Sequence, residues 1–403
     1  MTESEQLIDV ERLLKESSLD DLNRAAEDYF ARLTSWNYHL AKPFGSVDET
    51  PQLLINFAVI LQGLRICPGM TILEFGAGTC WASRFLSQLG CHVIAADISA
   101  TALRIGQELY ARQPLIGNQP EPRFLLFDGN RLDVPSESVD RIICLDAFHH
   151  VPNPAETLRE LARVLKNGGI AGFAEPGPNH SRSAQSQYEM RVYGVLENNI
   201  DVRKIWGYAE LAGFSEMKLA VFNIPPMHLT IQEFENFLSG GKTVNRWMET
   251  TRGFMESERN FFLYKGAPEA LDSRFRTGLL AKITIDPNPF TGKAGETIKL
   301  QALVTNTSES VWLPRGAGFG AVLLGCHVYY ANNVMYRHSY HWEALTPDEG
   351  RPILPKESVA LDVNIPALDK GNYILEFDMI SNDVCWFALN GSQQVRVAVQ
   401  IVS

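Results

Sequence analysis

The first chemically suggestive feature of the sequence is a pair of glycines at the end of an apolar run, in Glu74-Phe75-Gly76-Ala77-Gly78. Glycines at such positions let the backbone turn tightly and let a ligand approach the amides at the start of the next helix. A dinucleotide-binding loop would carry a third glycine at position 81, where this chain has Trp81. The loop therefore favours a nucleoside ligand without a pyrophosphate, and the alternative is a tight strand-to-helix turn that binds nothing.

Carboxylates follow the next apolar runs of the chain. Asp97 closes the run at 93–96 and lies about 20 residues beyond the glycines, the offset at which a carboxylate accepts hydrogen bonds from ribose hydroxyls. Asp128-Gly129 follows the third run, where a carboxylate can take an adenine amino group, and Asp146 follows the fourth. Two alternatives stay open, a helix cap for Asp97 and an ordinary turn at Asp128.

The elements that must position these residues are short apolar runs that alternate with helical stretches between residues 50 and 267. This alternation predicts an α/β Rossmann-like domain with a parallel sheet whose strands are buried on both faces. Two further runs complete a seven-stranded sheet, and we expect them to form an antiparallel edge because no full helix separates them. The expected strands are 71–75, 92–96, 123–127, 141–145, 169–174, 217–222 and 260–264.

The ordered motifs together resemble the class I S-adenosylmethionine-dependent methyltransferases of the type 11/25 kind, over about residues 70–175. The motifs are the glycine loop, Asp97, Asp128, His149-His150-Val151-Pro152 and Leu165-Lys166-Asn167-Gly168-Gly169. The resemblance implies S-adenosyl-L-methionine as the cofactor, bound at the carboxyl ends of the strands. It also implies that Glu74 and the glycines hold the methionine part, Asp97 the ribose and Asp128 the adenine. The cofactor residues that we expect are Glu74, Gly76, Ala77, Gly78, Asp97, Ile98, Asp128, Gly129 and Asp146.

Two histidines and an acid follow the fourth and fifth expected strands and should border the acceptor side of the sulfonium. Methyl transfer needs an acceptor lone pair in line with the methyl group, and a hydroxyl acceptor must also lose a proton. We therefore expect His149, His150 and Glu175 as catalytic candidates, of which His150 and Glu175 match methyltransferases of hydroxyl acceptors best. The alternative is that one histidine only hydrogen-bonds the backbone. No metal site is expected, because no residue set has metal-ligand spacing.

From about residue 280 the hydrophobic period changes to two, as in Ile298, Leu300, Ala302 and Val304. This pattern predicts an all-β sandwich. We divide the chain into a helical lead-in at 1–50, a methyltransferase domain at 51–268 and a β-sandwich accessory domain at 276–403. The last region resembles immunoglobulin-like accessory domains of bacterial surface-polysaccharide enzymes and transporters, which implies glycan recognition. Its tryptophans, Trp312 and Trp386, are expected in the core rather than stacked on sugars.

The composition and charge of the chain limit the classes of partner that it is expected to bind. The chain has 403 residues and a net charge of -11, which disfavours nucleic acid. Residues 1–60 hold eleven acids against five bases (11 − 5 = 6), so most of this acidity should say little about the active site. Six cysteines without CxxC spacing and the lack of an apolar run of about 20 residues predict a cytoplasmic protein without a membrane span.

The leading hypothesis is an enzyme that transfers a methyl group from S-adenosyl-L-methionine to a hydroxyl oxygen, with a saccharide or polysaccharide as a candidate acceptor. One alternative is a methyltransferase of small-molecule natural products. Another is a non-catalytic, cofactor-binding assembly protein. The expected partner is a small-molecule or glycan acceptor, and a homo-oligomer is left open.

Overall fold

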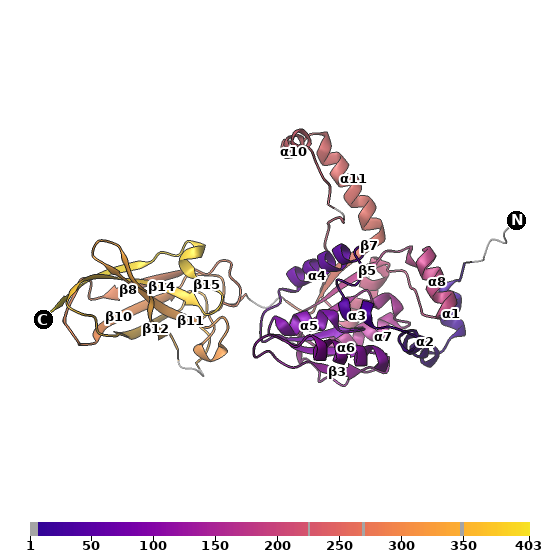
Figure 1. The fold of residues 1–403 in the computed structure, drawn as a ribbon, viewed down its shortest axis with the longest axis horizontal. Helices are drawn as coiled ribbons and strands as arrows, with labels where there is room; N and C mark the ends of the chain where they lie inside the picture. The colour runs from indigo at the N-terminus through magenta and orange to yellow at the C-terminus, as the bar shows by residue number, and fades with distance from the viewer. Residues whose placement is uncertain (1–6, 225, 268–270, 347–349) are drawn as a thin grey trace. The chain divides into compact units, whose positions relative to one another are not determined.

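The computed structural model describes residues 7–224, 226–267, 271–346 and 350–403 (Figure 1). The chain divides into two compact units, Met1–Pro268 and Glu269–Ser403. Residues 1–6 of the predicted lead-in lie outside the described residues. No helix in the described ranges is long and apolar enough to cross a membrane.

The first unit contains a seven-stranded sheet in the order β3-β2-β1-β4-β5-β7-β6. The first five strands in this order pair in parallel, whereas β7 is antiparallel to both β5 and β6. The predicted Rossmann-like sheet with an antiparallel edge is thus confirmed. The strands are β1 (Thr71–Phe75), β2 (His92–Asp97), β3 (Arg123–Leu126), β4 (Val139–Leu145), β5 (Leu165–Pro176), β6 (Glu216–Leu219) and β7 (Glu258–Tyr264).

Helices pack against this sheet with apolar side chains at helical spacing, such as Leu158 and Leu161 of the helix at 154–164. Phe173 on β5 and Phe261 on β7 stack 4.7 Å apart between ring centres in the buried core. The helices from the lead-in to the last crossover are α1 (Val10–Glu16), α2 (Leu19–Ala31), α3 (Asn37–Ala41), α4 (Thr50–Leu64), α5 (Trp81–Gln88), α6 (Ala100–Arg112), α7 (Pro154–Val164), α8 (Ala184–Val192) and α9 (Val202–Ala212).

Two helices leave the body of the first unit. Helices α10 (Ile231–Leu238) and α11 (Lys242–Ser257) form a hairpin that projects away from the sheet before the chain returns into β7 (Figure 1). Phe237 and Trp247 contact each other edge to face and hold the hairpin together. The hairpin does not contribute to the lining of the cavity described below.

The second unit is built of β-strands in two sheets, ordered β13-β10-β8 and β12-β11-β14-β16-β9, with β15 paired to β14. Alternate residues of β10 are buried, as the period of two predicted. The all-β prediction is confirmed, and its immunoglobulin-like character stays a prediction. The strands are β8 (Ala281–Asp286), β9 (Phe290–Lys293), β10 (Ile298–Asn306), β11 (Val322–Tyr330), β12 (Met335–Ala344), β13 (Ser358–Ile365), β14 (Gly371–Ser381), β15 (Cys385–Trp386) and β16 (Val395–Val402).

The two tryptophans expected in the core of the second unit differ. Trp312 is 1% exposed and packs against Phe387. Its indole N–H donates to the Ser308 hydroxyl. Trp386 is only half-buried and lies against the His327 ring. The core prediction therefore holds in full for Trp312 and in part for Trp386.

Candidate active site

A cavity of about 340 Å³ opens at the carboxyl ends of β1, β2 and β4. This edge is where ligands of open parallel sheets bind, since strand ends and helix N-termini meet there. The lining includes 74–79 after β1, 97–98 after β2, 127 and 129 after β3, and 145–147 after β4.

The glycine loop has the backbone conformation that its sequence predicts. Gly76 has φ +69°, and a Cβ there would lie 2.4 Å from the Cβ of Ala147, so only glycine fits. The amide of Gly78 donates to Oδ2 of Asp97 at 2.7 Å, which ties the loop to the end of β2. Trp81, at the position of the third dinucleotide glycine, begins α5 and packs on Phe57. The indole also belongs to the lining of the cavity.

Two buried carboxylates face this loop. Glu74 is 2% exposed and accepts a hydrogen bond from the Ser83 hydroxyl. Burial raises the pKa of Glu74 to about 8. Asp97 is 7% exposed, and its Oδ1 accepts from the Ser99 amide at 2.8 Å. Burial also raises the pKa of Asp97, against the opposing effect of these backbone hydrogen bonds. Asp97 therefore supports the local backbone, and its place in the lining also lets it meet a ligand.

Eight of the nine expected cofactor residues line the cavity, and Asp128 does not. Oδ1 of Asp128 accepts from the amides of Asn130 and Arg131 at 2.8 and 2.9 Å. The exposed carboxylate thus forms the ordinary turn that was the alternative for this residue. The eight lining residues are Glu74, Gly76, Ala77, Gly78, Asp97, Ile98, Gly129 and Asp146.

The N-terminal helices also line the cavity, although the sequence analysis treated them as a lead-in. Glu27 on α2 accepts from the Ser99 hydroxyl at 2.6 Å and from the Thr101 hydroxyl at 2.5 Å. This carboxylate fixes α2 at the start of α6. The apolar spacing of α2 was the signal in the sequence, because such a face needs a partner. The lining residues from this segment are Leu19, Leu22, Asn23, Ala26, Tyr29, Phe30, His39 and Lys42.

Glu175 and His149 form a buried pair behind the turn after β4. The Glu175 carboxylate accepts from the amides of Ala147, Phe148 and His149, and Nδ1 of His149 lies 2.8 Å from its Oε2. Burial alone would lower the pKa of His149, but the hydrogen bond and charge of Glu175 raise it to about 9. Neither residue belongs to the cavity lining. Their observed contacts position the turn.

His150 is the one of the three catalytic candidates that lines the cavity. Its Nδ1 lies 2.6 Å from the carbonyl oxygen of Leu196, which can only accept, so Nδ1 carries the proton. In the neutral ring the lone pair is then on Nε2, which has no hydrogen-bond partner within the described ranges. Burial and the charge of His149 lower the pKa of His150. The imidazole is 40% exposed as a side chain, enough for an acceptor to reach it.

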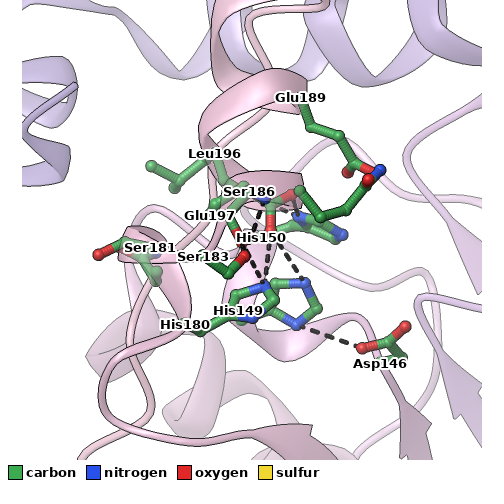
Figure 2. A network of polar contacts seen from close by, with 12 residues as sticks. Asp146, His149, His150, His180, Ser181, Ser183, Ser186, Glu189, Leu196 and Glu197 are labelled. Atoms are coloured by element: carbon green, nitrogen blue, oxygen red, sulfur yellow. Dashed lines mark hydrogen bonds and ion pairs between the residues drawn. The ribbon is translucent and has the colours of Figure 1, made fainter. Parts of the chain in front are cut away.

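Sequence reasoning missed Glu197, which lies beside all three histidines of this region. Its Oε2 is 2.6 Å from Nε2 of His180 and 3.8 Å from Nε2 of His149. Its Oε1 is 3.4 Å from Nδ1 of His150. Figure 2 shows these rings gathered around the carboxylate. The segment that carries Glu197 has no regular secondary structure, so no periodicity marked it.

Comparison with known proteins agrees with this geometry. Residues 73–173, which run from β1 into β5, match the model of a family described as "Methyltransferase domain". Demethylmenaquinone methyltransferase of Renibacterium salmoninarum is 26% identical over 143 residues, which are 35% of this chain and 56% of that protein. The ubiquinone/menaquinone biosynthesis C-methyltransferase UbiE of Pseudomonas aeruginosa is 28% identical over 147 residues, again 35% and 56%. The chain thus spans about half the length of these curated relatives.

Among solved structures, the fold is similar to phosphoethanolamine N-methyltransferase 2 of Haemonchus contortus. That likeness covers 63% of this chain and 61% of the other, with 16% identity and a TM-score of 0.43.

The sheet and the glycine loop form a Rossmann-like domain, and its residues 73–173 match the methyltransferase family model. The residues that line the cavity fit S-adenosyl-L-methionine, the cofactor that the sequence resemblance implies. The buried carboxylates can accept its hydroxyl and ammonium protons. The family match ends at residue 173, before Glu197 and the helices that follow.

Proposed function

We propose that this chain transfers the methyl group of S-adenosyl-L-methionine to a small-molecule acceptor in the cavity at the carboxyl ends of β1, β2 and β4. One observation carries the proposal: the same cavity is lined by the glycine loop with Asp97 and by the imidazole of His150. Donor and proton acceptor thus share one enclosed space, as an in-line displacement requires.

For a hydroxyl acceptor, His150 is the residue that we propose to take the proton. Its Nδ1–H is held by the Leu196 carbonyl, so the lone pair on Nε2 is the one available. The oxygen attacks the methyl carbon, the bond from that carbon to the sulfonium breaks, and the hydroxyl proton passes to Nε2 of His150. S-adenosylhomocysteine leaves as a neutral thioether.

His149 and Glu175 serve this step as positioning residues in our proposal. The Glu175 carboxylate accepts hydrogen bonds from three backbone amides of the turn that carries His150. It also pairs with the imidazole of His149, the residue that precedes His150 in the sequence. Loss of Glu175 would leave these buried amides unpaired. The turn would then shift, and His150 with it.

The charge of the residues that line the cavity limits which class of methyl acceptor can bind there. The carboxylates of Asp97, Asp146 and Glu189 lie in the lining together with a single lysine, Lys42. A polyanionic acceptor would be repelled, so we propose a neutral or cationic molecule. A carbon acceptor is the second candidate, because a relative is named a C-methyltransferase. A saccharide acceptor stays a hypothesis that neither relative's name supports.

The test is calorimetric titration of the full chain with S-adenosyl-L-methionine. We expect saturable binding to the wild type and at least about tenfold weaker binding to Asp97→Ala, which loses both the loop contact and a buried acceptor. Asp362→Ala, an exposed aspartate in β13, is the control and should bind as the wild type does. Failure of the wild type to bind the cofactor would refute the proposal.

Acceptor identity requires a second assay with methyl-labelled cofactor and separate pools of phenols, quinols, amines and saccharides. Label in the phenol or quinol pool that disappears with His150→Gln supports the hydroxyl step. Label on carbon supports the second candidate. Transfer unaffected by His150→Gln contradicts the assigned base.

A further inference from the structure

The cluster behind the cavity contains two buried carboxylates whose ion-pair partners are histidines. Glu175 and Glu197 have side chains 0% and 3% exposed. Glu175 pairs with His149, and Glu197 lies within 4.0 Å of His149, His150 and His180. Two buried anions require compensating positive charge. Protons on the histidines can supply it, and so can one divalent cation.

One oxygen of this cluster lacks a hydrogen bond. Oε1 of Glu197 is fully buried and has no hydrogen-bond partner within the described parts of the chain. A buried carboxylate oxygen without a partner is costly, and a bound ion is one of the established reasons for such an atom. Nδ1 of His150 lies 3.4 Å from this oxygen.

The orientation of His149 provides a second, independent indication. Its Nδ1–H donates to Glu175, so in the neutral ring the lone pair is on Nε2. That nitrogen faces Oε2 of Glu197 at 3.8 Å. A carboxylate that holds the far nitrogen of a histidine is the usual arrangement behind a metal-binding imidazole.

We propose that His149, His150 and Glu197 bind a divalent transition-metal ion of the Zn²⁺ class. Each residue offers one ligand atom, and these atoms all lie within 4.8 Å of one another. Oε1 of Glu197 lies 3.4 Å from Nδ1 of His150, a separation that suits two atoms placed about 2.0–2.2 Å from a common ion. Two imidazoles and a carboxylate leave a coordination position open, and this donor set suits zinc or another borderline divalent ion. The sequence analysis expected no metal, because spacing along the chain does not link Glu197 to the histidine pair.

Ion binding changes the chemistry of His150. Coordination through Nδ1 replaces the contact with the Leu196 carbonyl, and the Nδ1 proton moves to Nε2 so that the ring stays neutral. Nε2 then has no lone pair for an acceptor proton. The occupied site therefore inhibits methyl transfer to a hydroxyl. The site itself does not depend on the proposed function, whereas this inhibition does.

The experiment is a titration of untagged, chelator-treated full-length protein with Zn²⁺, and in parallel with Co²⁺ as a spectroscopic probe. We expect one ion per chain and a visible Co²⁺ absorption band. Glu197→Gln should weaken Zn²⁺ affinity at least tenfold and abolish the band. The control is Glu343→Gln, which removes a carboxylate paired with His341 at 3.0 Å in the second unit and should change neither readout.

Each outcome bears on the proposal. Stoichiometric binding that Glu197→Gln and His149→Gln both weaken, while cofactor binding shows that the variants are folded, supports the site. No stoichiometric binding to the wild type overturns it, and so does binding that neither variant changes. If Zn²⁺ binds at this site but leaves methyl transfer to a hydroxyl unaffected, the site stands and the base role of His150 fails.

Discussion

The two units of this chain bury similar polar side chains but place them differently. In the first unit, Glu74, Asp97 and Glu175 all lie at or near the carboxyl ends of parallel strands, around one edge of the sheet. In the second, Glu376 and Asp378 are buried within β14 itself. Glu376 has its own local partners, Arg396 and the Tyr329 hydroxyl.

Strand direction explains this difference. Parallel strands bring their carboxyl ends to the same edge, so residues far apart in sequence meet there. Antiparallel strands alternate in direction, so their carboxyl ends do not meet at one edge, and the polar groups of such a sheet are distributed along it. The buried carboxylates of the first unit thus gather near the edge of the sheet where the cavity opens, whereas those of the second lie along one strand.

The largest effect that we expect from this comparison is on catalysis. His150→Gln should lower kcat for a hydroxyl acceptor about 10²–10⁴-fold, because the proton acceptor is lost. The dissociation constant of the cofactor should change by less than about threefold, since binding groups remain. His341→Gln, in the second unit, is the matched control and should leave kcat unchanged. An equal loss of kcat in His150→Gln and His341→Gln would contradict the contrast between the two units.

A large-to-small substitution in the core of the second unit tests whether cofactor binding depends on the stability of that unit. Phe377 is fully buried in its core, so Phe377→Ala should destabilise this unit by about 3–5 kcal/mol. Urea unfolding followed by circular dichroism should show an earlier transition for this unit. Calorimetric titration with cofactor below that transition should show unchanged affinity. Loss of cofactor binding in the folded variant would show that the second unit supports the site.

The sequence was sufficient for the parts of the fold that depend on local patterns. Alternating apolar runs predicted the parallel strands and the two edge strands. The expectation that no full helix separates the two edge strands was wrong, because α10 and α11 lie between β6 and β7. The Gly76-Ala77-Gly78 loop was recognisable because backbone conformation and close approach demand glycine there. In these cases the physical requirement acts over a few neighbouring residues.

Residues that join the site through tertiary contacts could not be found this way. Glu197 reaches the histidines from a segment without secondary structure, and Glu27 reaches α6 across 72 residues of sequence. Asp128 is the reverse case, a residue that was predicted in the site but does not line the cavity. The sequence could not separate the two roles, because a turn and a ligand contact both favour aspartate at this position. The N-terminal segment, predicted only as a helical lead-in, also lines the cavity, but with residues other than its acids.

Glu27 allows that N-terminal contribution to be measured. Glu27→Gln replaces a carboxylate that accepts from two hydroxyls and the Thr101 amide, so α2 should dock less firmly against α6. We expect the cofactor affinity to fall by about 1.5–3 kcal/mol, the range of a hydrogen bond to a charged group. Calorimetric titration is the measurement, and Glu11→Gln on exposed α1 is the control. If both variants bind the cofactor with equal affinity, the N-terminal segment has no role in cofactor binding.

The smallest expected effect concerns Asp378, whose buried carboxylate should affect only the stability of the second unit. Burial raises the pKa of Asp378 to about 6, and Oδ1 has no hydrogen-bond partner within the described residues. The unfolded chain should titrate this group near 3.9. Because the folded state holds the proton more tightly, the associated stability is present below about pH 4 and is lost as the pH rises through 6.

Asp378→Asn, which stays neutral at every pH, should therefore gain stability relative to the wild type as the pH rises from about 4 to 6. The gain should level off above that range at about 1–3 kcal/mol. Urea unfolding of both proteins between pH 4 and 8 measures it, with Asp362→Asn as the exposed control. Parallel stability curves would show that the carboxylate is not strained by burial. If Asp378→Asn instead changed the cofactor affinity, a buried polar group of the second unit would contribute to cofactor binding, and the contrast between the two units would be wrong.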